Sequence, residues 1–188
     1  MKNFQQIAAG VDVLPLCHAI KTQPELWDQN NWRKNYAGSP HLDISDIWLR
    51  YSSPNAVDDE SNTTKVVNDV APVWYPAMGK LWQARPIVLD LMRRVEAYEL
   101  GRLLITKLPP GGRILPHSDA QGAYTDQDGS RYHVVLQGLP GSLFRSGDET
   151  VNMQTGSVWW FDHTEEHEVI NNSADDRIHL LVDLKVMR

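Results

Sequence analysis

Three side chains in the second half of the chain have the types and spacing of a metal site. His117 and Asp119 form a His-x-Asp pair, and His167 follows forty-eight residues after Asp119. On an extended segment, side chains two residues apart point to the same face, so this pair would form one chelating arm. Two imidazoles and one carboxylate on one face of a metal leave its other coordination positions open, as non-haem Fe(II) chemistry needs. The three residues therefore predict an iron site.

The His-x-acid pattern alone is not selective, because the chain contains it three times. The other copies are His41-Leu42-Asp43 and His163-Thr164-Glu165, and such a pair is commonly a surface or structural feature. Context separates the copy at residues 117–119 from them. A turn-forming run, Pro109-Pro110-Gly111-Gly112, precedes it, and His167 opens a strand-like run farther along the chain. A strand-borne histidine that returns to a His-x-Asp arm is the arrangement of a double-stranded β-helix.

Arg177 lies ten residues after His167 and opens a mostly apolar strand-like run. A charged residue there can be a solvated strand end. It can also be functional, because a guanidinium matches a carboxylate and a cosubstrate such as 2-oxoglutarate has a distal carboxylate that must be bound. His179 would share the face of Arg177 and either contacts the pocket or is a structural histidine. We expect His163 to lie behind the metal ligands or at the surface.

Length and charge limit the classes of protein. The 188 residues fit one domain, and a net charge of −6 with scattered Lys and Arg gives no basic stripe for nucleic acid. Cys17 is the only cysteine, so no intrachain disulfide can form. We read no signal peptide, and no apolar run reaches the roughly 18 residues of a membrane-spanning helix. We expect a cytoplasmic monomer or homodimer without a nucleic-acid or membrane partner.

Residues 1–100 are expected to be a support of helices and strand. One or two short helices are expected within residues 11–34, and residues 46–51 alternate as a strand with apolar residues on both faces. Residues 52–68 have the composition of a loop. Apolar spacing after Pro72 predicts a helix, and a further helix is expected over residues 87–99.

From Gly101 the pattern changes to short β-like runs separated by Gly, Pro and Asn. The runs cover residues 103–108, 132–137, 142–145, 157–161, 168–171 and 178–186. Many short strands with this punctuation predict a β-sandwich or jelly roll. We therefore expect an α+β, mainly β chain with a cupin-like double-stranded β-helix in residues 101–188 as the catalytic core. The N-terminal helices would pack on one of its sheets.

The segment from about Thr106 to Lys185 resembles the aspartyl/asparaginyl β-hydroxylase family of Fe(II)- and 2-oxoglutarate-dependent oxygenases. The matching stretches are Pro116-His117, Arg131-Tyr132-His133, Gly156-Ser157-Val158-Trp159-Trp160-Phe161-Asp162, Glu166-His167-Glu168-Val169, Asn171-Asn172, and Arg177 with Leu181-Val182-Asp183. They span roughly the last two-fifths of the chain. The resemblance implies a jelly-roll oxygenase that binds iron and 2-oxoglutarate.

Roles for individual residues follow from this resemblance. It implies that His117 and His167 bind iron and that Arg177 binds the distal carboxylate of 2-oxoglutarate. Arg131 and His133 would approach the cosubstrate or its metal-bound carboxylate. Thr106 falls where the family places a hydroxyl near the distal carboxylate, although it can also be a plain strand residue, and His133 can be a core histidine.

Asp119 departs from the best known eukaryotic members of the family, which have no carboxylate at the third ligand position. Here the carboxylate would complete the triad and neutralise part of the iron charge. Relatives that transfer halide need this carboxylate to be absent, so that chloride has room. Asp119 therefore favours hydroxylation over halogenation.

The resemblance implies a dioxygenase that uses Fe(II), 2-oxoglutarate and O2 to hydroxylate an amino acid or a peptidyl residue of the Asp, Asn or Pro kind, releasing succinate and CO2. A small amino acid or a short peptide is the expected substrate. The alternatives are a cupin-type metal-binding isomerase and a non-catalytic sensor or binding module. Residues 121–129 are expected to rim the substrate mouth. Candidate substrate contacts are Trp48, Arg50, Tyr124, Arg145 and Trp160.

Overall fold

Two antiparallel β-sheets face each other in the computed structural model, which describes residues 1–53, 72–119 and 129–187. The large sheet has the order β1 (Phe4–Ala8), β9 (Val158–Phe161), β6 (Gly129–Gln137), β11 (Arg177–Val186), β4 (Ala97–Leu108), β2 (Ser45–Tyr51), β3 (Val73–Trp74). The small sheet has the order β5 (Arg113–His117), β10 (His167–Asn171), β7 (Ser142–Ser146), β8 (Glu149–Val151). The chain is the α+β, mainly β jelly roll that its sequence predicts.

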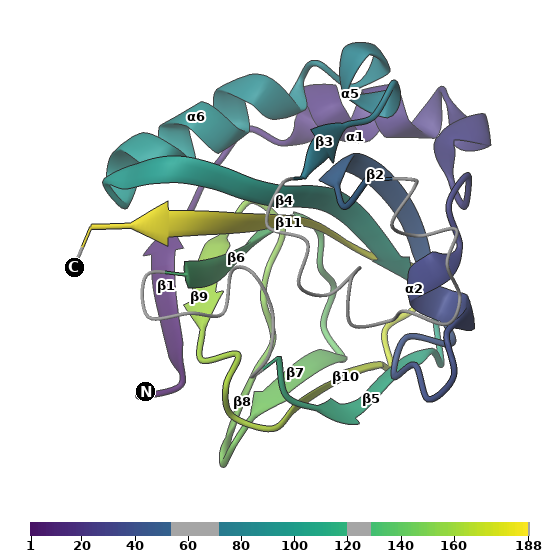
Figure 1. The fold of residues 1–188 in the computed structure, drawn as a ribbon. Helices are drawn as coiled ribbons and strands as arrows, with labels where there is room; N and C mark the ends of the chain where they lie inside the picture. Colours follow the sequence, from purple (N-terminus) through teal and green to yellow (C-terminus); the bar gives the residue numbers. More distant parts are fainter. Residues whose placement is uncertain (54–71, 120–128, 188) are drawn as a thin grey trace.

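Helices cover the outer face of the large sheet, and the small sheet lies against its inner face (Figure 1). Those on the outer face are α1 (Leu14–Lys21), α5 (Ala77–Lys80) and α6 (Ala84–Arg94). The 3-10 helix η1 (Pro24–Leu26) and the single-turn α2 (Trp32–Asn35) connect α1 to β2. This confirms that N-terminal helices pack on one sheet. No helix among the described residues is long and apolar enough to cross a membrane.

Strand β11 shows how the sheet separates core from pocket. Successive side chains of a strand point to opposite faces. Leu180, Val182 and Leu184 are buried in the hydrophobic cluster that the helices complete with residues such as Leu16 and Leu91. The alternate side chains of β11 face the small sheet, and they are Arg177, His179, Leu181 and Asp183. One strand thus contributes apolar side chains to the core on one face and a mainly polar row of side chains to the space between the sheets on the other.

A smaller apolar cluster closes the space between the sheets. Phe144 from β7 and Phe161 from β9 lie with ring centroids 4.8 Å apart, and Val169 from β10 is buried beside them. Phe4 from β1 meets Phe144 edge-on at 5.5 Å. These side chains fix the distance between the two sheets near the polar row of β11.

Several predicted elements change length. The helix expected over residues 87–99 starts at Ala84 and ends at Arg94, because Glu96 takes a positive φ of 54° and reverses the chain into β4. The helix expected after Pro72 is divided between strand β3 and helix α5. Strands β1, β5 and β8 were not predicted. The loop expected at residues 52–68 lies almost entirely outside the described residues.

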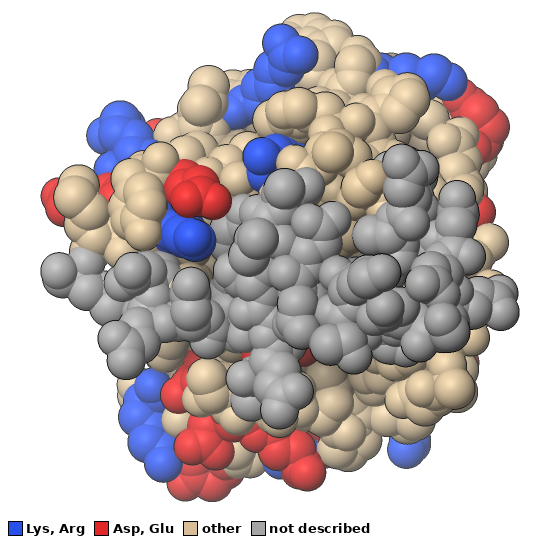
Figure 2. Space-filling view, in the orientation of Figure 1, with Lys and Arg blue, Asp and Glu red and all other residues tan. Residues whose placement is uncertain are grey.

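Positive and negative side chains are interspersed on the face of the molecule shown in Figure 2. The described residues of that face form no continuous basic stripe. The absence of a nucleic-acid partner stays a prediction from the sequence.

The fully buried Asn171 predicts a stability effect at the end of β10. Its amide Nδ2 donates to the carbonyls of Leu108 and Asp175, both at 2.9 Å, and its Oδ1 accepts from Ser173 Oγ at 2.6 Å. Asn171→Ala leaves these buried groups without partners, so we expect it to lower the free energy of unfolding by about 3 kcal/mol in urea denaturation. The exposed neighbour gives the control, and Asn172→Ala should change it by less than about 0.5 kcal/mol. Equal values for the two variants would contradict the prediction.

Candidate metal centre

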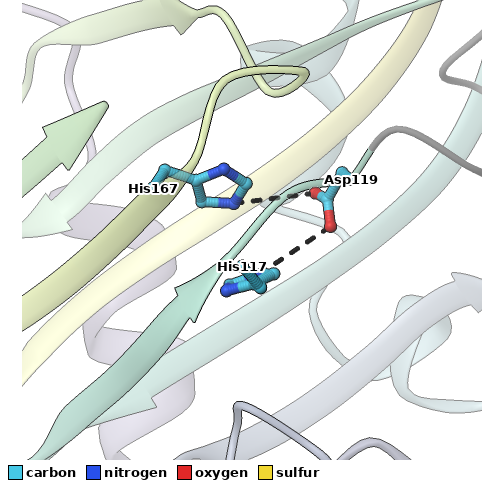
Figure 3. Close-up of side chains that lie close together, drawn as sticks. All are labelled: His117, Asp119 and His167. Atoms are coloured by element: carbon cyan, nitrogen blue, oxygen red, sulfur yellow. Dashed lines mark ion pairs between the residues drawn. The ribbon is translucent and has the colours of Figure 1, made fainter. Parts of the chain in front are cut away.

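His117, Asp119 and His167 meet at one end of the small sheet (Figure 3). One ligating atom from each lies within 4.8 Å of the others. His117 Nε2 is 3.8 Å from Asp119 Oδ1, and His167 Nε2 is 4.0 Å from Asp119 Oδ2. The structure therefore brings together the three residues that the sequence singles out as metal ligands.

Strand pairing places the two histidines. His117 ends β5, His167 begins β10, and the antiparallel register puts them directly opposite each other. Side chains at opposite positions of neighbouring strands share a face. Asp119 follows β5 by two residues, and its backbone N–H donates to the carbonyl of His163 at 2.9 Å. This bond holds the carboxylate over the pair of imidazoles.

Backbone carbonyls fix the orientation of both imidazoles. His117 Nδ1 lies 2.7 Å from the carbonyl of Leu115, and His167 Nδ1 lies 3.0 Å from the carbonyl of Glu165. Carbonyls only accept, so each Nδ1 is a donor, and in the neutral ring this leaves the lone pair on Nε2. A metal-binding histidine is commonly held in this way by a hydrogen bond from its other ring nitrogen. Both Nε2 atoms are therefore prepared as metal ligands.

The protonation states of His167 and Asp119 suit a metal cation. Burial lowers the pKa of His167 to about 4, so its imidazole is neutral near pH 7. Burial by itself would raise the pKa of Asp119, but Arg131 and the neighbouring histidines His167, His117 and His41 together outweigh it and hold that pKa well below its usual range. The centre thus offers neutral nitrogen and anionic oxygen, which are the forms that bind metal.

Arg131 is held between two aspartates. Its Nε and Nη2 donate to the two carboxylate oxygens of Asp183 at 2.7 and 3.0 Å, and its Nη1 donates to Asp119 Oδ2. This bidentate contact aims the third guanidinium nitrogen at the metal centre. Arg131 therefore orients Asp119, and its approach to a cosubstrate stays a prediction.

Arg177 is a buried guanidinium that faces the same cavity as the triad. It is 3% exposed, it lies over the ring of Phe144 at 5.7 Å, and its Nη2 donates to His179 Nδ1 at 3.1 Å. Burial lowers its pKa to about 9, and no carboxylate of the described residues offsets that effect. A buried charge without a counterion is unfavourable, so the site is suited to an anionic ligand.

Two buried histidines support Arg177. Since a guanidinium only donates, His179 Nδ1 is an acceptor, and His133 Nδ1, 3.1 Å away, must carry a proton to share it. Burial, aided by the charge of Arg177, lowers the pKa of both histidines well below the usual value. The prediction left open whether His179 lies at the pocket or in the core. It is buried and contacts the pocket arginine.

Thr106 lines the cavity of Arg177 but already has partners. Its hydroxyl donates to Asp46 Oδ1 at 2.7 Å and accepts from Arg33 Nη1 at 3.3 Å. Arg33 also pairs with Asp46 Oδ2 at 2.8 Å. The hydroxyl proton is therefore committed to Asp46, and a contact of Thr106 with the cosubstrate stays a prediction.

Side chains alternate between the two faces of a strand, so the candidate substrate contacts do not all face the cavity. Trp48 is buried with Leu104 and Leu181 on the inner face, beside the cavity that Leu181 lines. Trp160 instead packs against the cluster under the helices, because its neighbour Trp159 takes the inner face. The sequence pattern does not show which of two adjacent tryptophans faces the space between the sheets. The structure places Trp160 away from the triad.

Two arginines among these candidates also lie elsewhere. Arg145 is paired with Glu168 at 2.6 Å and Glu166 at 3.0 Å, while the preceding Phe144 takes the inner face of β7. Arg50 donates to the backbone carbonyls of Leu100 and Gly101 at 2.7 and 2.9 Å. Neither arginine is among the described residues that line the cavity of the triad. Tyr124 and nearly all of the 121–129 loop lie outside the described residues.

His163 is buried rather than at the surface, and it lies behind the metal ligands. Its carbonyl accepts the Asp119 N–H, and its ring centroid is 6.3 Å from that of Phe161. Neither ring nitrogen has a hydrogen-bond partner within the described part of the chain.

Sequence reasoning missed Arg33, His41 and Asp46 as members of the site. His41 lies edge-on to His117 with ring centroids 5.0 Å apart, and Arg33 Nη2 is 3.4 Å from His41 Nε2. His41 had one signal, as a copy of the His-x-acid pattern, but it lacked a partner histidine on a strand. Arg33 and Asp46 had no local signal, because their partners are distant in sequence.

Comparison with known families gives a match across more than half of the chain. A family model described as Aspartyl/Asparaginyl beta-hydroxylase matches residues 77–186. That range includes the triad and Arg177. It excludes Arg33 and His41.

A curated relative and two solved structures resemble this chain. L-proline cis-4-hydroxylase from Rhizobium meliloti (strain 1021) is 28% identical over 81 residues, which are 43% of this chain and only 28% of that protein. An oxidoreductase of the 2OG-Fe(II) oxygenase family from Burkholderia pseudomallei has a TM-score of 0.53 and 17% identity, covering 76% of this chain and 66% of its own. A viral collagen prolyl hydroxylase from Paramecium Bursaria Chlorella virus-1, solved with 2OG, has a TM-score of 0.53 and 11% identity, covering 100% and 97%. These two likenesses show the shared fold.

The buried His167 predicts acid sensitivity of the metal-free protein. Between its usual pKa near 6.5 and its folded value of about 4, the unfolded chain binds a proton at His167 and the folded chain does not. Its contribution to stability is therefore complete above pH 6.5 and is lost as the pH falls toward 4, at about 1.4 kcal/mol per pH unit. Urea denaturation in chelator at several pH values measures this slope.

A matched pair of variants shows whether His167 causes this dependence of the free energy of unfolding on pH. His167→Asn should make the pH dependence shallower by the share of one histidine, whereas His18→Asn, at an exposed position of α1, should leave it unchanged. Stability that stays constant across that pH range, or an equal slope in His167→Asn and the parent protein, would contradict the prediction.

Proposed function

Since the chain belongs to the aspartyl/asparaginyl β-hydroxylase family, we propose that it is an Fe(II)- and 2-oxoglutarate-dependent dioxygenase that hydroxylates an amino acid or a peptidyl residue. The observation that carries the proposal is that His117, Asp119 and His167 share one cavity with the buried Arg177. One group of residues is suited to a metal, and the other is suited to a carboxylate. 2-Oxoglutarate has the chemistry to bind both.

The donor set fits Fe(II). Two neutral imidazoles and one carboxylate on one face are the ligands that non-haem Fe(II) oxygenases use, and they leave positions open for other ligands. When bound, Fe(II), 2-oxoglutarate and O2 supply the oxidising chemistry, in which the cosubstrate becomes succinate and CO2 and the substrate gains a hydroxyl group. The retained carboxylate of Asp119 favours hydroxylation over halogenation, because it occupies the position that a halide would need.

The residues of the chain position the cosubstrate and exclude water. We assign the distal carboxylate of 2-oxoglutarate to the guanidinium of Arg177, whose orientation His179 fixes. Arg131 keeps Asp119 ionised and aimed at the metal. The apolar side chains that line the cavity keep water from the reacting groups, and these are Ile114, Phe144, Phe161, Val169 and Leu181.

The substrate class is proposed from relatives. The family is described by hydroxylation of aspartyl and asparaginyl residues, and the curated relative acts on L-proline. We therefore propose an amino acid, free or in a short peptide, of the Asp, Asn or Pro kind. A metal-binding isomerase or a non-catalytic module gives no role to a buried arginine that lacks a carboxylate partner in the described structure.

Arg177→Met tests the cosubstrate site. Anaerobic addition of Fe(II) and then 2-oxoglutarate should give the parent protein the weak visible charge-transfer band of the iron chelate. The variant keeps a side chain of similar length but loses the charge-assisted bonds, so we expect its affinity for 2-oxoglutarate to fall at least about a hundredfold. Arg145→Met removes an arginine that pairs with surface glutamates, and it should leave the affinity unchanged.

Turnover decides between the oxygenase and its alternatives. A screen of free amino acids and short peptides should find at least one that raises succinate formation above the rate without substrate. If the parent protein gives no charge-transfer band, and Arg177→Met binds 2-oxoglutarate as well as Arg145→Met does, the proposed function is wrong.

A further inference from the structure

His41 and Arg33 form a polar wall of the triad cavity that comes from outside the family match. Both line the cavity, and both precede residue 77, where the match begins. His41 packs edge-on against the metal-site residue His117, with ring centroids 5.0 Å apart. Arg33 is held behind it by the buried carboxylate of Asp46 at 2.8 Å. This wall is thus a feature of this chain that the family model does not define.

The contact with Arg33 determines which nitrogen of His41 carries a proton. Arg33 Nη2 lies 3.4 Å from His41 Nε2, and a guanidinium has donors only, so this nitrogen must accept. The proton of the neutral ring is therefore on Nδ1. A protonated ring would turn an Nε2–H toward the guanidinium of Arg33, so the neutral ring is the form that fits this contact.

The Nδ1 donor of His41 has no acceptor in the part of the chain that the structure describes. It is buried, and no described residue provides a hydrogen-bond partner for it. A buried donor without a partner is unfavourable, and such atoms are rare in native structures. Its position in a ring beside His117, on the wall of a cavity, indicates that the missing acceptor belongs to a bound molecule. A carboxylate oxygen is a strong acceptor for such a donor, because hydrogen bonds to an ionised acceptor are stronger than those between neutral groups.

The balance of charges in the site limits the net charge of the bound molecule. In the described part of the site, Arg33 is paired with Asp46, and Arg131 lies between two aspartates. With Arg177 these make three positive and three negative side chains. Fe(II) and the dianion of 2-oxoglutarate also cancel. A substrate with no net charge is therefore favoured, and a free amino acid with an uncharged side chain has both a carboxylate and zero net charge.

We propose that His41 Nδ1, held in place by Arg33, binds the α-carboxylate of the substrate, and that the substrate is a free amino acid with an uncharged side chain rather than a residue within a peptide. This inference rests on the proposed function and narrows it. A residue whose carbonyl forms a peptide bond has no α-carboxylate for His41 to bind. Arg33 acts as a positioning residue, because it sets the tautomer and the orientation of the imidazole.

The test compares uncharged L-amino acids, L-proline among them, with their primary amides. Each is titrated by calorimetry into the parent protein loaded with Fe(II) and 2-oxoglutarate without oxygen, and the change in the charge-transfer band is recorded as a second readout. At least one free amino acid should bind, and it should bind at least about tenfold more tightly than its amide.

Variants of His41 separate the hydrogen bond from the shape of the side chain. His41→Asn can present its amide nitrogen where Nδ1 lies, so it should keep the preference for the free acid. His41→Gln places its amide nitrogen nearer the Nε2 position, and His41→Phe has no donor, so both should lose the preference. Thermal unfolding shows which variants are folded. If the Phe variant does not fold, the comparison of the Asn and Gln variants still tests the proposal.

The inference is wrong if no free amino acid binds the parent protein more tightly than its amide, or if the folded Gln or Phe variant keeps the preference. The charge-transfer band of the parent protein separates this failure from a failure of the proposed function. A band without any preference for free acids contradicts this inference alone, whereas the absence of the band contradicts both.

Discussion

The pleat of strand β11 is the constraint on which the site depends. Its odd-numbered residues from Arg177 to Asp183 face the small sheet, and its even-numbered residues are packed against the helix-side core. Slipping a strand by one residue moves every side chain to the opposite face. Such a slip would bury Arg177 among leucines and place leucines beside the metal centre. The large apolar cluster of the outer face therefore fixes the register that presents Arg177 and Asp183 to the cavity.

Charged groups extend this constraint to the candidate metal ligands. Asp183 holds Arg131 by two hydrogen bonds, and Arg131 holds Asp119 over the histidines of β5 and β10. Arg177, six residues from Asp183 on the same strand, lacks a comparable carboxylate in the described structure. One arginine is neutralised by the chain, and the other is left for a ligand. This difference supports an orienting role for Arg131 and the proposed binding role for Arg177.

The sequence predicted the parts that depend on local pattern. Strand periodicity located most of β2, β6, β7, β9, β10 and β11 and the second half of β4, and spacing selected the three residues of the triad. Where two large apolar residues are adjacent, the pattern does not show which one points into the space between the sheets. The sequence therefore predicted Trp160 at the pocket, although Trp159 takes the inner face. The sequence also could not find Arg33, because the hydrogen bond to Thr106 spans 73 residues and leaves no local pattern. Helix spacing continued past Arg94 because nothing in the local pattern indicates the positive φ of Glu96.

The most direct measurement is a crystal structure of the protein grown without oxygen, with Mn(II) in place of Fe(II) and with 2-oxoglutarate. We predict a single Mn(II) bound by Nε2 of His117, a carboxylate oxygen of Asp119 and Nε2 of His167. We also predict 2-oxoglutarate on that metal, with its distal carboxylate on the guanidinium of Arg177. A metal bound by other residues, or a cosubstrate whose distal carboxylate does not contact Arg177, would contradict this prediction.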